Sequence, residues 1–334
     1  MRRLGAGRMV VAAQCLLNPG SGPPESVLLY HDGDDPVNGE PMNKRRTLAS
    51  EWVLSGVGLH SGAPVAMRLR PAPPDSGIVF VRTDLGGARI PALIENAGPS
   101  FYATVLQKNG ATVSTIEHLM AALYAMQVDD LDIELDAAEA PILDGSSKPF
   151  VEGILAAGFR EHDVARQYIH VTKPVTVTHE DKRISVHPCP EYRVTYAIDF
   201  DHPALGYQEL TASLWRVDQF VEKVAPARTF TFEHEVAALR ERGLALGGSL
   251  DNAVVVGEAG LLNPPLRFAD EFVRHKMLDL TGDLSLLGRP LRGHVVAYRA
   301  GHDLHARLAH AIAEAKDSWY LAPWTEVAAE TSAP

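Results

Sequence analysis

The chain has 334 residues, of which 46% are hydrophobic and 22% charged. This balance is typical of a folded protein, and the length suggests about two domains. The formal net charge of −11 argues against a protein dominated by nucleic-acid phosphate contacts, and no apolar run is long enough for a membrane-spanning helix. Cys15 and Cys189 are too few for a disulfide framework or a cysteine-rich zinc site. A bound metal would therefore need histidines and carboxylates as ligands.

Both ends of the chain differ from the rest. Residues 1–43 contain many prolines and glycines and no hydrophobic period, so we expect a disordered N-terminal extension. Two alternatives stay open, a weak signal peptide over residues 2–17 and a translation start at Met42. We expect residues 324–334 to be a loose C-terminal tail.

In the first half of the chain between these two ends, the sequence predicts strands and two helices. Residues 46–69 are strand-like, with a break at the glycine-rich segment 55–62. The spacing of Ile116, Leu119, Met120 and Leu123 predicts a helix with one apolar stripe. The further elements predicted here are strands at 78–82 and 131–135 and helices at 112–126 and 150–157.

The second half repeats this rhythm after a polar stretch at 160–167, which we expect to be a linker. The predicted elements are strands at 168–177, 183–186, 193–200 and 294–299 and helices at 233–242, 270–284 and 303–316. Strands grouped before helices favour an α+β fold over a doubly wound sheet. We expect a first domain at residues 44–165 and a second at 168–323.

The predicted helix at 270–284 has a polar stripe beside its apolar one. His275, Asp279 and Asp283 are spaced four apart, so they lie on one helix face with neighbouring side chains about 5–6 Å apart. An imidazole and a carboxylate so placed can hold one zinc ion. The same spacing also occurs by chance on solvated helices, and a third ligand must come from elsewhere.

The dipeptide Glu117-His118 has two interpretations. Ser114 and Glu117 match a capping box, in which both residues cap the helix and His118 is solvated. Alternatively, His118 completes a zinc site with an open fourth position, and Glu117 serves as a base for the attacking water.

Three loop features are ambiguous in the same way. His302, between a predicted strand and the last helix, is well placed for proton transfer but is also an ordinary loop residue. His60 follows two glycines that suggest a turn, and Asp144-Gly145 is typical of a β-turn.

Six stretches occur together in a recognisable order: Gly56-Val-Gly-Leu-His-Ser-Gly62, Ser114-Thr-Ile-Glu-His-Leu119, Pro141-Ile-Leu-Asp-Gly-Ser146, Ala227-Arg-Thr-Phe230, Arg274-His-Lys-Met-Leu-Asp279 with Gly282-Asp283, and Gly301-His302. In this order they resemble the UDP-3-O-acyl-N-acetylglucosamine deacetylases, the zinc enzymes of lipid A synthesis. The resemblance covers residues 44 to about 320. Met120 and Thr231 depart from what we expect of some members.

The resemblance implies two similar layered α/β-sandwich domains with the active site between them, and a role for each matching residue. Zn²⁺ is expected on His118, His275 and Asp279. Glu117 is expected as general base, His302 as general acid, Asp283 as the residue that orients it, and Thr229 as an oxyanion donor. Substrate contacts are expected from His60, Phe230, Lys276 and, more weakly, Phe200. Residues 247–256 are expected in the passage for the acyl chain.

The implied reaction is hydrolysis of the N-acetyl group of a UDP-linked acylated glucosamine. Another N-acetylated sugar and a non-catalytic binding module are the alternatives. We expect a cytoplasmic enzyme with peripheral contact to the inner membrane at most, no nucleic-acid partner and no obligate protein partner.

Overall fold

The computed structural model describes residues 42–99 and 102–324. The expectations for an N-terminal extension and a C-terminal tail therefore lie outside the described residues, apart from positions 42, 43 and 324. The first half of the described chain contains β1 Lys44–Leu48, β2 Trp52–Val57, β3 Pro64–Pro71, β4 Ile78–Arg82, β5 Ala88–Pro91, β6 Val105–Lys108, β7 Ala111–Ser114, α1 Glu117–Ala125, β8 Leu131–Leu135 and α2 Lys148–Ala157. Three single turns of 3₁₀ helix lie at Thr83–Leu85, Ile94–Asn96 and Ser285–Leu287.

The second half begins with strands, and its two longest helices lie near its end. Its elements are β9 Phe159–Ala165, β10 Tyr168–Val171, β11 Val175–His179, β12 Lys182–His187, β13 Tyr192–Asp199, β14 Tyr207–Ser213, α3 Val217–Lys223, β15 Phe230–Phe232, α4 Glu233–Glu241, β16 Val254–Gly257, β17 Gly260–Leu261, α5 Glu271–Leu284, β18 Leu291–Tyr298, α6 His302–Glu314 and β19 Trp319–Ala322. The helices predicted at 150–157, 233–242, 270–284 and 303–316 are thus confirmed to within two residues at each end.

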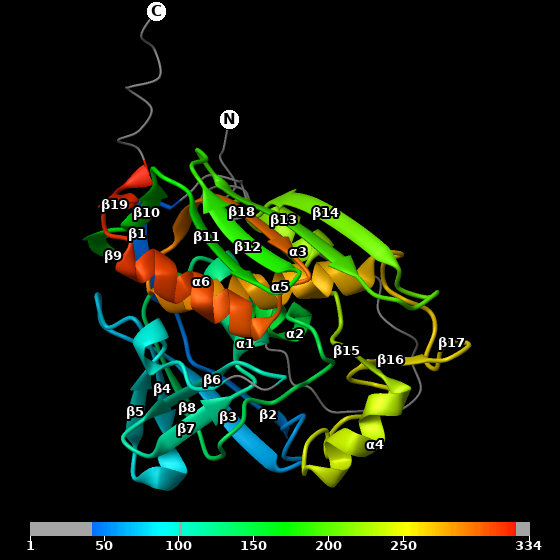
Figure 1. Ribbon diagram of the computed structural model, residues 1–334. Helices are drawn as coiled ribbons and strands as arrows, with labels where there is room; N and C mark the ends of the chain where they lie inside the picture. Colours follow the sequence, from blue (N-terminus) through cyan, green and yellow to red (C-terminus); the bar gives the residue numbers. More distant parts are fainter. Residues whose placement is uncertain (1–41, 100–101, 325–334) are drawn as a thin grey trace, which may run out of the picture. The chain divides into compact units, whose positions relative to one another are not determined.

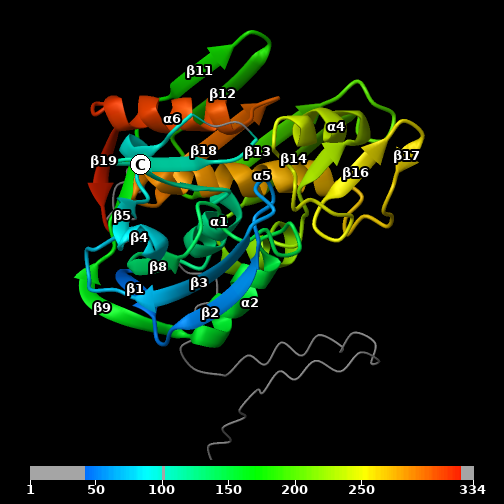
Figure 2. The same ribbon diagram turned by 90° about the horizontal axis from the view of Figure 1, so that it is seen from below.

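A five-stranded sheet with the order β2-β3-β8-β4-β5 forms one layer. Its central strand β8 is antiparallel to β3 and parallel to β4. Val65, Met67 and Leu69 alternate on the buried face of β3, as expected for a sheet with one side in the core. In both views α1 lies beside α5, while α2 contacts β2 at the sheet edge (Figures 1 and 2).

A seven-stranded sheet forms the other outer layer, built around β18. This strand is antiparallel to β12 and parallel to β13 and β10, while β11, β14 and β19 lie at the edges. α5 and α6 cover one face of this sheet (Figure 1). Val295 and Ala297 of β18 are buried and alternate with less buried neighbours, as expected for a strand with one face in the core.

A small third sheet, β15-β16-β17, is accompanied by α4 (Figure 2). β15 and β16 are parallel, and β16 and β17 are antiparallel. The mixture of grouped strands and packed helices confirms the predicted α+β class. All described residues belong to one compact unit, so the domain boundary expected near residues 165–168 stays a prediction.

Two local predictions are wrong. The stretch 160–167 is not a linker, because β9 pairs antiparallel with β1, and the guanidinium of Arg46 lies 4.0 Å from the ring centre of Phe159. Four of the seven residues of β9 are exposed, so this strand can be polar. The first helix begins at Glu117 rather than at Thr112, because residues 111–114 pair with β6 as β7. No helix in the described residues is long and apolar enough to cross a membrane.

Candidate active site and metal centre

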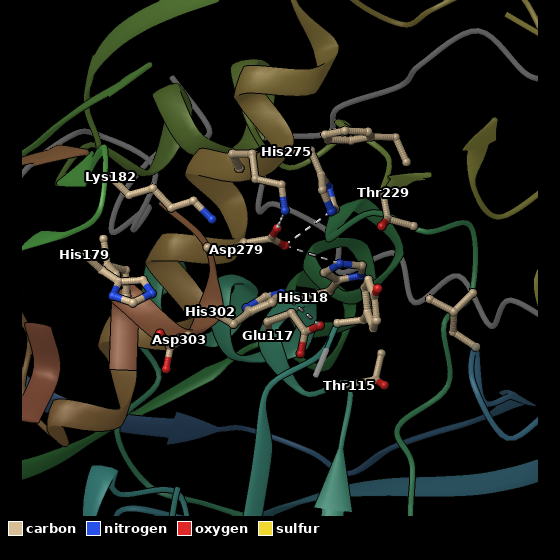
Figure 3. Close-up of a pocket in the computed structure, with 16 residues that line it drawn as sticks. Thr115, Glu117, His118, His179, Lys182, Thr229, His275, Asp279, His302 and Asp303 are labelled. Carbon is tan, nitrogen blue, oxygen red and sulfur yellow. Dashed lines mark hydrogen bonds and ion pairs between the residues drawn. The ribbon is translucent and has the colours of Figure 1, made fainter. Parts of the chain in front are cut away.

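Three potential metal ligands from two helices meet in the core. His118 lies in the first turn of α1, and His275 and Asp279 lie one turn apart on α5, which packs against α1. The Nε2 atoms of His118 and His275 lie 3.7 and 3.3 Å from Oδ1 of Asp279. All three side chains are buried and point toward one another (Figure 3). The structure thus assembles the predicted ligand set from distant parts of the chain.

The surroundings fix the orientation and charge of these ligands. Nδ1 of His275 lies 3.0 Å from the carbonyl oxygen of Ala227, to which it donates, so Nε2 keeps its lone pair. Burial lowers the pKa of His275, and burial together with His275 lowers the pKa of His118 to about 3. Burial opposes ionisation of Asp279, but His275 and Lys276 hold its pKa well below the usual range. Two neutral imidazoles therefore face a carboxylate.

One atom of this cluster has no hydrogen-bond partner. Lys276 donates to Oδ2 of Asp279 at 2.7 Å, whereas the buried Oδ1 receives no hydrogen bond from any described residue. A buried carboxylate oxygen without a donor is costly unless a cation contacts it. One atom from each of the three ligands lies within 4.8 Å of the others. The donor set and the unpaired oxygen both fit a divalent metal ion.

Glu117 lies beside this cluster and is held by backbone. The N–H of Thr104 donates to its Oε2 at 3.0 Å, and Nε2 of His302 lies 3.9 Å from its Oε1. Burial raises the pKa of Glu117 to about 7, close to the value that suits a general base at neutral pH. The capping box predicted for Ser114 and Glu117 is wrong, because Ile116 is the N-cap and the Ser114 hydroxyl donates to the carbonyl of Ala138. Nor is His118 solvated, since it is 4% exposed.

His302 is the first residue of α6, and its ring contacts the carboxylate of Asp283. Its Nδ1 lies 2.7 Å from Oδ2 of Asp283, which is one turn beyond Asp279 on α5. Burial lowers the pKa of His302, but Asp283 more than offsets this, and the pKa rises to about 9. Burial likewise opposes ionisation of Asp283, yet His302 lowers its pKa to about 2. The pair is therefore an imidazolium and a carboxylate near neutral pH.

The three potential metal ligands, Glu117 and His302 line a cavity of about 320 Å³. Thr229, Phe230 and Lys276 lie on its wall, and the Lys276 ammonium is 5.5 Å from the Phe230 ring centre. The sequence predicts no role for several further lining residues, among them Thr115, His179, Lys182 and Asp303 (Figure 3). His179 and Lys182 flank the turn between β11 and β12, and no local pattern indicates that this hairpin reaches the site.

A second cavity of about 470 Å³ adjoins the first, because both are lined by Leu59, Tyr102, Thr229 and Phe230. Its wall includes His60 and half of the segment 247–256 expected to form an acyl passage: Gly248, Ser249, Leu250, Ala253 and Val255. α4 also lines this cavity with Val236, Ala237 and Leu239, which nothing in the sequence predicts. Phe200 lines neither cavity and packs against the Phe230 ring at 6.0 Å between centres.

Comparison with known proteins gives a consistent result. A model of the UDP-3-O-acyl N-acetylglycosamine deacetylase family matches residues 45–314. A protein from Syntrophotalea carbinolica named UDP-3-O-acyl-N-acetylglucosamine deacetylase is 48% identical over 294 residues, which are 87% of this chain and 94% of the relative. Proteins of the same name from Myxococcus xanthus and Thermosynechococcus vestitus are 47% and 48% identical over 84% and 81% of this chain, and over 89% and 94% of their own lengths. This chain therefore belongs to the UDP-3-O-acyl N-acetylglycosamine deacetylase family.

Proposed function

We propose that this protein is a zinc-dependent amide hydrolase acting on UDP-3-O-acyl-N-acetylglucosamine. The products are acetate and UDP-3-O-acyl-glucosamine, and the reaction is the committed step of lipid A biosynthesis. The observation that carries the proposal is the buried cluster of His118, His275 and Asp279, with an unpaired carboxylate oxygen beside Glu117. Family membership supplies the substrate class.

The metal is proposed to be Zn²⁺, held by His118, His275 and Asp279. Two imidazole nitrogens and one carboxylate oxygen are a common zinc ligand set that leaves one position open. When bound, Zn²⁺ supplies polarisation of the amide carbonyl and acidifies the attacking water.

The protein's own groups then divide the proton transfers. Glu117, with its raised pKa, takes a proton from the water that attacks the acetamide carbonyl. The Thr229 hydroxyl, on the cavity wall, donates to the developing oxyanion. His302, charged through its contact with Asp283, donates a proton to the leaving amine. The amine would otherwise leave as an unstable anion.

The two adjoining cavities suit an amphiphilic substrate. The polar one holds the reacting groups, and Lys276 supplies a positive charge toward the sugar or diphosphate. The acyl chain is proposed to lie in the apolar cavity, which His60 lines, and Phe230 lines both cavities. Phe200 would act on the substrate only through its contact with Phe230. The two-domain division, the cytoplasmic location, the possible contact with the inner membrane and the absence of an obligate protein partner stay predictions.

The direct test is acetate release from UDP-3-O-acyl-N-acetylglucosamine by the purified protein. We expect turnover that is abolished by a chelator and restored by Zn²⁺. The matched comparison is UDP-N-acetylglucosamine without the acyl chain, which we expect to react much more slowly. Equal rates on both substrates would favour another N-acetylated sugar, and a protein without metal or turnover would contradict the proposal.

A further inference from the structure

A second histidine contacts the carboxylate that orients His302. Nδ1 of His305 lies 2.7 Å from Oδ2 of Asp283, the same oxygen that lies 2.7 Å from Nδ1 of His302. His305 is 0% exposed and lines neither cavity among those described, so it cannot touch the substrate. It is three residues after His302 on α6, so both rings lie on the same side of the helix.

Proton counting shows that His305 is a donor to Asp283. A carboxylate oxygen only accepts hydrogen bonds, so each Nδ1 atom that contacts Asp283 must carry a hydrogen. On the other side of the ring, Nε2 of His305 lies 3.0 Å from the hydroxyl oxygen of Tyr196. That hydroxyl donates its one hydrogen to the carbonyl oxygen of Ala300 at 2.8 Å, so the hydrogen on Nδ1 of His305 is assigned from the contact with Asp283 alone.

The remaining oxygen of Asp283 is also bound. The Thr104 hydroxyl donates to Oδ1 of Asp283 and lies 3.2 Å from Nδ1 of His302. The carboxylate is thus held from α6 on one side and from the loop before β6 on the other. The backbone N–H of Thr104 also donates to Glu117. Thr104 therefore links Glu117 and His302, the two groups proposed to transfer protons.

From this geometry we propose that His305 is a positioning residue, which holds the Asp283 carboxylate in the place and orientation that His302 needs. The inference rests on the proposed function, since His302 is taken there as the general acid. Without the His305 donor, one oxygen of Asp283 would lose half of its hydrogen bonds, and the carboxylate could turn toward Thr104. His302 would then be charged but misaligned with the leaving amine.

Three variants separate positioning from mere packing. His305→Leu fills the space but removes the donor. His305→Asn keeps an N–H donor at the position of Nδ1, whereas His305→Gln places its amide near the position of Nε2. We expect kcat to fall about 10–100-fold in the Leu and Gln variants, as when an outer-shell partner is lost. The Asn variant should restore most of kcat, and KM and metal content should change little in all three.

The matched control is His310→Asn, at an exposed position on the same helix, which should behave like the parent protein. Thermal unfolding identifies a variant that fails to fold. If the Leu variant fails to fold, comparison of the Asn and Gln variants still tests the inference. Parent-like kcat in the Leu and Gln variants would overturn the inference while the proposed function stood. An inactive parent protein would instead contradict the proposed function.

A spectroscopic measurement tests the inference without relying on activity. In metal-loaded protein with ¹⁵N-labelled histidines, we expect His305 to carry a hydrogen on Nδ1. The ring signals of His302 should shift in the Leu variant and return toward the parent values in the Asn variant. A neutral His305 that carries its hydrogen on Nε2 alone, or His302 ring signals that do not change in the Leu variant, would overturn the inference.

Discussion

Gly282 of α5 lies directly against the backbone of Glu117 in α1, so closely that a methyl group at Gly282 would overlap the carbonyl of Glu117. This contact brings the two helices together at the level of the proposed metal ligands, because Asp279 on α5 lies three residues before Gly282 and His118 on α1 directly follows Glu117. The glycine is needed for close approach rather than for an unusual backbone conformation.

We therefore predict that Gly282→Ala is destabilising and separates the ligands. Alanine has the better helix propensity by about 1 kcal/mol, but overpacking against a rigid backbone costs about 1–3 kcal/mol and should prevail. The free energy of unfolding in urea should fall, and metal affinity should fall with it. A variant as stable as the parent, with the same metal content, would show that the helices can move apart without cost.

Asp279→Ala should remove metal and activity together. Asp279 supplies the only carboxylate among the three proposed ligands, and its loss leaves two neutral imidazoles, which bind zinc weakly. Metal analysis of the purified variant and acetate release measure the two effects. Asp303→Ala, at an exposed carboxylate on the same cavity, is the control and should keep its metal. Full metal content in the Asp279 variant would exclude Asp279 as an essential ligand.

Glu117→Gln should separate chemistry from metal binding. The amide keeps the size of the side chain and an acceptor for the Thr104 N–H, but it cannot take a proton from water. We expect the metal to stay bound while kcat falls roughly 10²–10⁴-fold, the usual contribution of a general base. Near-parental kcat in a metal-loaded variant would make the base assignment wrong.

Comparison of sequence and structure shows why some of these residues were foreseeable. His275 and Asp279 are four residues apart on one helix, so the helical period alone predicts that they meet. The contribution of His118 depends on the packing of α1 against α5, which no local pattern encodes. The residues alone therefore leave it as one of two interpretations, and the family motifs favour it. Because the helix is predicted to start at Thr112, Glu117 is predicted within its second turn, whereas in the structure Glu117 is the first residue of α1.

The missed features involve contacts between distant segments. Thr104 reaches Glu117 and Asp283 from an irregular loop, and β9 is too polar to resemble a strand until it is paired with β1. α4 looks like an ordinary surface helix, and its role in the apolar cavity follows only from its place beside β16. Local periodicity predicts elements well, whereas their partners depend on the whole chain.

The pH dependence of turnover should report His302. Its pKa is raised to about 9, and a general acid works only when protonated, so kcat should fall as the pH rises through about 9. His302→Gln should lower kcat and remove this alkaline decrease while the metal stays bound. If the variant kept the decrease at the same pH, another group would be responsible for it.

The apolar cavity should determine how well the acyl chain of the substrate binds. Ala237 lines this cavity from α4, whereas the adjacent Ala238 is equally exposed but does not line it. Ala237→Trp should obstruct the cavity and lower kcat/KM for the acylated substrate by about tenfold or more, since losing the contacts of two or three buried methylenes costs roughly 2 kcal/mol. Activity on UDP-N-acetylglucosamine without the acyl chain should be unchanged in this variant, and Ala238→Trp should leave both activities as they are. If Ala237→Trp lowered kcat/KM equally for both substrates, the acyl chain would have to bind elsewhere.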